Sequence, residues 1–141
     1  MHDNRVHNVE KVYQYRLSSS DSDYEAMQSL FQSKHYNWAL FMGHLVIEKL
    51  IKAYHVKTTS THAMYSHDLR LLESKSNIGI PPDMTLLLDT ITGFNINTRY
   101  DSYKSDFQRR CTPEFTNEWI ANINRLRLWI RERLLAQPNS M

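Results

Sequence analysis

Three ionisable side chains recur at intervals of four residues, at His44, Glu48 and Lys52. In an α-helix, residues four apart lie on one face, so these side chains would form one polar line, called here the polar seam. The seam could be an ordinary ion pair between Glu48 and Lys52 beside a histidine, worth about 0.2–0.5 kcal/mol. It could instead face another subunit, a ligand or a partner. The spacing by itself favours the ordinary ion pair.

The polar segment that follows, KTTSTHAMYSH (residues 57–67), contains two further histidines, His62 and His67. Two histidines five residues apart raise the question of a metal site. Zinc sites in proteins need three or four ligands, and this segment has no cysteine, no HExxH motif and no evident third ligand. We therefore expect neither a metal site nor a cofactor.

Residues 94–111, FNINTRYDSYKSDFQRRC, mix aromatic and basic side chains. Tyrosine and phenylalanine alternate there with arginine and lysine, at Arg99, Tyr100, Tyr103, Lys104, Phe107, Arg109 and Arg110. Guanidinium groups form paired hydrogen bonds with phosphates, and aromatic rings stack on bases, so the mixture suits contact with a nucleotide. The alternative, which we favour on composition alone, is a surface loop whose tyrosines anchor it to the core.

The positive charge is concentrated in the last third of the chain. The formal charge of the whole sequence is +2, which is too small to require a nucleic-acid partner. From Arg99 onward, however, eight basic residues face five acidic ones, which gives this part +3 and the rest −1. This local excess points modestly to an anionic partner.

The element that must position the polar seam is the stretch from His35 to Val56. Its apolar residues recur at helical spacing on more than one face, which is typical of a buried central helix. His44, Glu48, Lys49 and Lys52 interrupt the apolar run, so it is too short to span a membrane. We expect it to be the core helix against which the others pack.

The composition favours helices around this core. A length of 141 residues suits one domain, and only 3 glycines and 4 prolines leave few turn signals. The single cysteine, Cys111, excludes an internal disulfide and suits a reducing compartment. Because the N-terminus lacks the apolar run of a signal peptide, we expect a cytoplasmic protein with no membrane partner.

The flanking elements follow from their start and stop signals. Residues 1–21 would be a short helix or an arm, and the run SSSDSD would break the chain before a helix from Ser22, with Ser22 and Glu25 as a capping box. Later helices would begin after Ser66, at Pro82 or Asp83, and after Thr112, and the helix that begins at Pro82 or Asp83 would stop at Gly93. Together they predict an all-α fold, an antiparallel up-and-down four-helix bundle with a short extra helix. The bundle would occupy residues 22–136, followed by a tail at 137–141.

Three segments resemble HEPN domains, an all-α family of higher eukaryotes and prokaryotes. Residues 38–53 (WALFMGHLVIEKLIKA) are similar to the second helix of the family. Residues 66–69 (SHDL) resemble the start of its third helix, and residues 98–101 (TRYD) resemble the Ala-Arg-Tyr-Pro segment before its last helix, with Asp101 in place of proline. The order and spacing agree over about residues 20–136.

The resemblance implies a bundle that forms homodimers, and a cytoplasmic role in prokaryotic systems. Several members of the family pair with a minimal nucleotidyltransferase in toxin–antitoxin modules. Others are ribonucleases with an Arg-x4-6-His motif. This chain lacks the motif, because no histidine follows Arg99, Arg109 or Arg110, and none lies at the required distance after any earlier arginine.

Our prediction is therefore a non-catalytic HEPN-like domain that binds nucleotide or nucleic-acid phosphate, with a nucleotidyltransferase partner. The site predicted from the resemblance is His67, Asp68, Arg99 and Tyr100. His67 would lie at a helix N-terminus, where unpaired N–H groups favour an anion, and Asp68 would orient His67 or cap the helix. The alternatives are a divergent metal-independent ribonuclease that uses His67 and Arg99 across a dimer, and a purely structural dimerisation module in which the seam forms the interface.

Overall fold

Helix α2 (Tyr36–Thr59) lies at the centre of the molecule, because its sequence is apolar around most of its circumference. Its fully buried side chains include Leu40, Ile47 and Ile51. In the computed structural model, which describes residues 3–138, α2 contacts its neighbours on all sides. They are α1 (Val9–Gln32), α3 (Leu69–Ser76), α4 (Pro82–Arg99), α5 (Asp101–Arg110) and α6 (Pro113–Leu135). The predicted core helix is confirmed.

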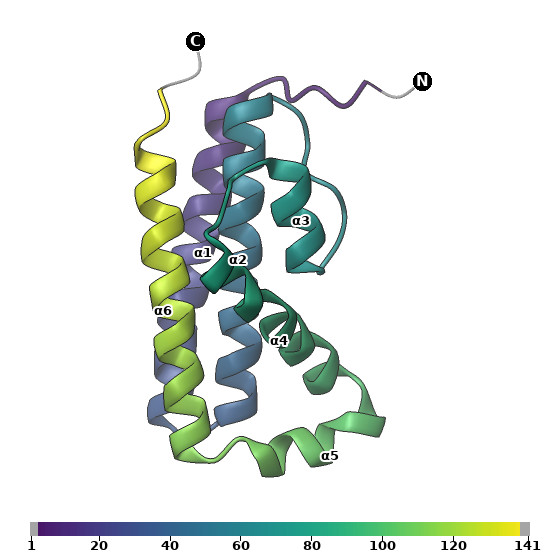
Figure 1. Cartoon of the computed structure of the whole chain (residues 1–141), viewed down its shortest axis with the longest axis vertical. Coiled ribbons are helices and arrows are strands. Elements are labelled where there is room, and N and C mark those ends of the chain that lie inside the picture. Colours follow the sequence, from purple (N-terminus) through teal and green to yellow (C-terminus); the bar gives the residue numbers. More distant parts are fainter. Residues whose placement is uncertain (1–2, 139–141) are drawn as a thin grey trace.

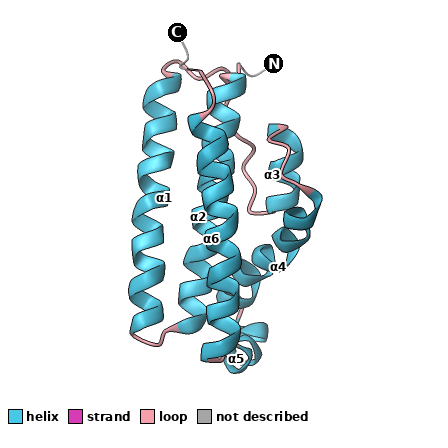
Figure 2. Cartoon of the chain, turned by 60° about the vertical axis from the view of Figure 1, so that its left-hand side comes forward, coloured by secondary structure: helices cyan, strands magenta, loops and turns pink. Residues whose placement is uncertain are grey.

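The regular elements within residues 3–138 are all helices, apart from an isolated bridge between Arg5 and Thr61. Along the long axis of Figure 1, α1 runs in one direction, α2 returns, α4 descends at a tilt, and α6 returns again. This is the up-and-down order of a four-helix bundle. The predicted all-α class and the predicted bundle are both confirmed (Figure 1). Figure 2 shows α1 on one side of α2 and α6, and the α3–α4 pair on the other. The bundle carries two short helices, α3 and α5, where the sequence predicted one.

Helix α1 is continuous through the serine and aspartate run at residues 18–23, so the predicted break and the capping box at Ser22 are wrong. The helix begins after Asn8, whose side chain accepts a hydrogen bond from Lys11 N at 3.1 Å. Residues 9–21 are therefore part of the bundle and not an arm. The run stays helical because several of its polar side chains have partners on α2 and α6. Ser20 Oγ, for example, is buried and donates to the Val46 carbonyl at 2.9 Å.

The connection from α1 to α2 is as tight as predicted. Lys34 adopts a positive φ of 67°, and the amide of His35 donates back to the Leu30 carbonyl at 2.8 Å. This is the Schellman arrangement that ends many helices, here with lysine where glycine is usual. It reverses the chain at once, so α1 and α2 lie antiparallel.

Gly43 lets α2 approach both α1 and α6. A Cβ at this position would lie 2.4 Å from Ile123 Cδ1 and 3.2 Å from Met27 Sδ. Both distances are shorter than ordinary van der Waals contacts, so only glycine fits without movement of its neighbours. Three helices meet closely at this point.

The second half of the chain is more helical than its sequence predicts. Helix α4 passes through Gly93 to Arg99, so Gly93 is not a cap. Residues 101–110 form α5 and not an irregular loop. The reason is that Phe94 and Phe107 are buried together, with ring centroids 5.6 Å apart, and this contact holds both segments against the core. The predicted start of the last helix at Thr112 and Pro113 is confirmed.

Within residues 3–138, no helix is long and apolar enough to cross a membrane. Of the predicted tail, residues 139–141 lie outside the described residues, and α6 ends at Leu135.

Candidate functional site

The polar seam is buried inside one chain and does not face another subunit. His44, Glu48 and Lys52 are 0%, 6% and 7% exposed. Lys52 Nζ donates to Glu48 Oε2 at 3.1 Å, so the predicted ion pair exists, but it lies in the interior. A buried pair of charges is costly unless further hydrogen bonds satisfy it, so the second oxygen of Glu48 needs a partner.

His67 supplies that partner. Its Nδ1 lies 2.7 Å from Glu48 Oε1, and the side chain is 42% exposed where that of Glu48 is 7% exposed. Since an ionised carboxylate can only accept, Nδ1 of His67 carries the hydrogen. Nε2, which has no hydrogen-bond partner among residues 3–138, is then the ring nitrogen available to solvent or to a ligand.

A chain of hydrogen bonds continues from His67 to Arg99. The carbonyl of His67 accepts from His44 Nε2 at 2.8 Å, so Nδ1 of a neutral His44 has a free lone pair. The amide nitrogen of Asn95 donates to that Nδ1 at 3.3 Å. The amide oxygen of Asn95 accepts from Arg99 Nε at 2.5 Å. We call the whole series, from Lys52 to Arg99, the buried network.

The surroundings of the network determine its charges. Burial lowers the pKa of His44, and it outweighs the hydrogen bond to the His67 carbonyl and the nearby charge of Glu48. For Glu48, burial acts to raise the pKa, but the hydrogen bond from His67 and the positive charge of Lys52 together hold the pKa below its usual value. The network therefore combines a neutral His44 with an ionised Glu48.

The N-terminus of α3 is not the anion site that the sequence predicted. The carboxylate of Asp68, and not Ser66, caps this helix, and it accepts from Arg70 N at 3.1 Å and from Leu71 N at 3.3 Å. The amide of Leu69 donates to Thr92 Oγ1 at 3.1 Å. Because these donors are occupied and a negative charge already lies beside them, they cannot attract a phosphate. Of the predicted site residues, His67 and Arg99 still have side-chain nitrogens without a partner in the described chain.

Arg99 is held at one end and open at the other. Its Nε is bound to Asn95, and its guanidinium carbon lies 5.3 Å from the ring centroid of Tyr100, which is 53% exposed. Within the described chain, its two terminal nitrogens have no hydrogen-bond partner, and Asp101 forms no ion pair with it. Arg99 thus keeps a two-pronged donor for an incoming oxyanion.

Sequence reasoning missed Asn95 and the way the seam joins His67. Asn95 continues the apolar stripe of Met84, Leu88 and Ile91, and it is 2% exposed. An amide in such a stripe is the signal that could have revealed it, because a buried amide needs partners.

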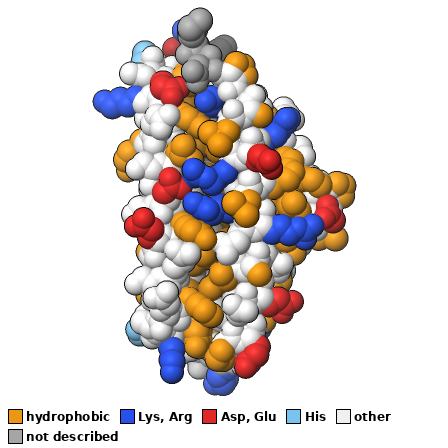
Figure 3. All heavy atoms as spheres, turned by 90° about the vertical axis from the view of Figure 1, so that its left-hand side faces the viewer, with side chains coloured by type: hydrophobic (Ala, Val, Ile, Leu, Met, Phe, Trp, Pro, Cys, Tyr) orange, Lys and Arg blue, Asp and Glu red, His pale blue; other side chains and the backbone are white. Residues whose placement is uncertain are grey.

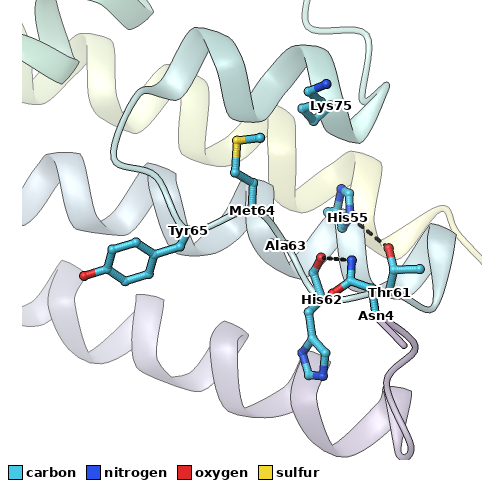
Figure 4. Close-up of a pocket in the computed structure, with 8 residues that line it drawn as sticks. All are labelled: Asn4, His55, Thr61, His62, Ala63, Met64, Tyr65 and Lys75. Carbon is cyan, nitrogen blue, oxygen red and sulfur yellow. Dashed lines mark hydrogen bonds between the residues drawn. The ribbon is translucent and has the colours of Figure 1, made fainter. Parts of the chain in front are cut away.

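A pocket of about 480 Å³ lies near this site but is separate from the buried network (Figure 4). It lies at the carboxyl ends of α2 and α3, where helix dipoles disfavour anions, and its residues include His55, His62, Met64, Tyr65 and Lys75. Burial, together with the charge of Arg16, lowers the pKa of His55 and favours its neutral form. We therefore do not assign this pocket to phosphate.

His62 lines this pocket, while the imidazole of His67 binds Glu48. The described residues hold no group of three or more His, Cys, Asp or Glu side chains that could bind a metal ion.

A family model described as the HEPN domain matches residues 13–133. The chain belongs to the HEPN domain family. The match begins well before residue 22, in agreement with the continuous α1. Family membership brings a role related to nucleotides or nucleic acids at the level of the family, and HEPN domains commonly dimerise.

The fold of this HEPN domain is similar to a solved structure, the crystal structure of TT1696 from Thermus thermophilus. The TM-score is 0.73 at 17% sequence identity, and the match covers 86% of this chain and 97% of that one. At this identity the likeness supports the fold alone. A comparison with curated proteins finds no match.

Proposed function

We propose that this HEPN domain binds the phosphate of a nucleotide or nucleic acid without cleaving it, through His67, Arg99 and Tyr100. The observation that supports this most is the buried network, which ties His67 and Arg99 to the core and leaves Nε2 of His67 and the two terminal nitrogens of Arg99 without a partner in the described chain. Because the network already fixes the side chains of His67 and Arg99, they lose little side-chain entropy when a ligand binds. Asp68 contributes as the cap of α3 and does not touch the anion.

The chemistry of the two outward groups matches a phosphate. Arg99 can donate two parallel hydrogen bonds from its terminal nitrogens. As an imidazolium, His67 would donate from Nε2 while Nδ1 keeps its bond to Glu48. Tyr100 adds an exposed ring and hydroxyl beside the guanidinium. Hydrogen bonds to charged groups contribute about 1.5–3 kcal/mol each.

The variant Arg99→Gln tests the phosphate site. Glutamine can still donate a hydrogen bond to the Asn95 amide, which truncation to alanine would leave unpaired in the interior. We expect binding of a labelled nucleotide or RNA to weaken about tenfold or more, with little change in melting temperature. Arg109→Gln is the control, because Arg109 is exposed and pairs with Asp106 on α5. Unchanged affinity in Arg99→Gln would remove Arg99 from the site.

We further propose that the domain works as a homodimer with a minimal nucleotidyltransferase partner, in a module of the toxin–antitoxin type. Family membership supports both parts of this proposal. Figure 3 shows hydrophobic side chains on the α1–α6 side of the molecule. On α6, Leu128 and Leu135 are 62% and 75% exposed, and exposed apolar side chains of this kind suit an interface. Co-expression with a nucleotidyltransferase encoded beside this gene should give a complex that co-purifies. The absence of such a gene, or of a complex, would count against the partner.

A second candidate function is metal-independent RNA cleavage, and the Glu48–His67 contact favours it. A carboxylate that holds Nδ1–H of a histidine and leaves Nε2 outward is an arrangement suited to acid–base catalysis. If this is the function, purified protein will cleave single-stranded RNA in the presence of EDTA, and His67→Gln will abolish the cleavage. RNA that stays intact under these conditions leaves the binding function as the better assignment.

A further inference from the structure

Exposed aromatic rings lie on either side of the proposed phosphate site. Tyr65 is 93% exposed, Tyr100 and Tyr103 are each 53% exposed, and Trp38 is 39% exposed. We call these four residues the aromatic edge. Single exposed rings are normal on a protein surface, but a group of them around one site is a mark of an interaction surface.

Helix α5 connects three of these rings. Tyr100 at its N-cap, Tyr103, Lys104 and Phe107 follow the spacing that places residues on one helix face. Phe107 on this face is buried against Phe94, whereas Tyr100 and Tyr103 remain 53% exposed. Lys104 Nζ lies 5.3 Å from the ring centroid of Trp38 on α2. The rings of Tyr100, Tyr103 and Trp38 therefore extend from Arg99 along α5 to the start of α2.

Tyr65 marks the other end, beyond His67. The two rings have centroids 6.1 Å apart and are tilted by 57°. The segment that carries Tyr65 is held by Asn4, whose carbonyl accepts from His62 N at 2.9 Å and whose amide donates to the His62 carbonyl at 3.2 Å. Tyr65 also lines the neighbouring pocket, and Figure 4 shows its ring directed away from His55 and His62. The ring is thus presented to solvent from an ordered segment.

Positive charges alternate with these rings. Arg99 lies over Tyr100, and Lys104 lies over Trp38, each at 5.3 Å. Helix α5 also carries two acidic residues. Asp106 is paired with Arg109, and Asp101 is the acidic residue closest to Arg99 in the sequence. Rings that stack on bases and cations that meet phosphates are the two features that unpaired nucleic-acid strands require of a binding surface.

We infer that the aromatic edge is the stacking surface for an unpaired nucleic-acid strand, with its phosphates at Arg99, His67 and Lys104. This inference rests on the proposed function, since it assigns neighbours to the same phosphate site. The rings make the surface selective for unpaired strands over duplexes and mononucleotides. The bases of a duplex are stacked on one another and cannot present their faces to Trp38 or Tyr103, and a mononucleotide has only one base to stack.

The test compares three probes under one salt concentration, because phosphate contacts depend on salt. The probes are a fluorescently labelled 12-nucleotide oligouridylate, a 12-base-pair RNA duplex, and UMP as a competitor. We expect the oligouridylate to bind at least tenfold more tightly than the duplex. Trp38→Leu and Tyr103→Leu should each weaken oligouridylate binding about tenfold and leave competition by UMP unchanged. Tyr15→Leu is the matched control, because this tyrosine is 73% exposed on α1.

The outcomes separate this inference from the proposed function. If Arg99→Gln weakens both oligouridylate and UMP binding while the two leucine variants bind normally, the phosphate site stands and the aromatic edge is overturned. Equal affinity for duplex and single strand overturns the edge as well. If neither probe binds the wild-type protein, both assignments fall. A DNA strand of the same length shows whether the sugar matters, and quenching of Trp38 fluorescence by oligouridylate, lost in Trp38→Leu, would support stacking directly.

Discussion

Glu48 is the residue on which the candidate site depends, because each of its oxygens accepts a different donor, Lys52 Nζ and His67 Nδ1. The spacing of the seam allowed its shared helix face to be predicted, since residues four apart meet on any helix. It could not show that His67, from a segment beyond the end of α2, returns to that face. That contact depends on how the whole chain folds, as does the link through Asn95.

At the scale of single residues, the buried His44 leads us to expect that the protein loses stability in acid. Because burial holds its folded pKa below the unfolded value of about 6.5, the unfolded state binds the proton more readily. The stabilisation is therefore complete above about pH 6.5 and is lost as the pH falls through and below that value. The lowered pKa of Glu48 acts in the same direction at lower pH.

The measurement is the melting temperature of wild type and His44→Gln between pH 7.5 and 5. We expect the wild type to lose more stability over this range than the variant. The contribution of His55, whose pKa is also lowered by burial, is common to both proteins and cancels in the comparison. Parallel curves would show that His44 does not become protonated on unfolding.

At the scale of elements, local signals predicted what local forces decide. Thr112 and Pro113 begin α6 as expected, because a capping hydroxyl and a proline act within one turn. The prediction was wrong at residues 18–23, because serine and aspartate side chains bond to nearby backbone groups and so disfavour a helix in an isolated segment. In the fold several of their side chains bond instead to other helices. Lys49 on α2 contacts Ser19 at 2.7 Å and Asp23 at 2.6 Å, and Arg131 on α6 contacts Asp21 at 2.7 Å. Tertiary partners thus overrode the local preference.

Lys34 gives a prediction about how α1 ends. A residue other than glycine in the left-handed region costs about 1–2 kcal/mol. Lys34→Gly should therefore raise the free energy of unfolding, by about 0.5–1 kcal/mol once the greater freedom of glycine in the unfolded chain is counted. Gln28→Gly, at an exposed position inside the helix, should lower it by about 1 kcal/mol. Urea denaturation of both variants checks the difference, and a loss of stability in Lys34→Gly would contradict it.

At the scale of the whole molecule, the meeting of α1, α2 and α6 at Gly43 can be probed by adding one carbon. Gly43→Ala should destabilise the protein by about 1–3 kcal/mol, because its Cβ would collide with Ile123 Cδ1. Ile123→Val removes that Cδ1 atom, so the double variant should recover part of the loss. If the two effects simply add in a double-mutant cycle, the collision is not the cause.

The proposed homodimer is also a property of the whole molecule. Light scattering on the purified protein should report twice the chain mass of 16.8 kDa. The expectation comes from membership of the HEPN family and from exposed apolar side chains such as Leu128. A mass of one chain at every concentration tested would exclude the dimer, and with it any site shared between two subunits.

The three-residue connection between α1 and α2 also has a consequence for the order of folding. These two helices join segments that are close in the chain, whereas α6 must find α2 across the intervening helices. Closing a short loop costs less entropy, so the α1–α2 pair should form early and the α2–α6 contact late. In stopped-flow experiments, Met27→Ala in α1 should mainly slow refolding. Ile130→Ala in α6 should mainly speed unfolding. The reverse pattern would place the nucleus elsewhere.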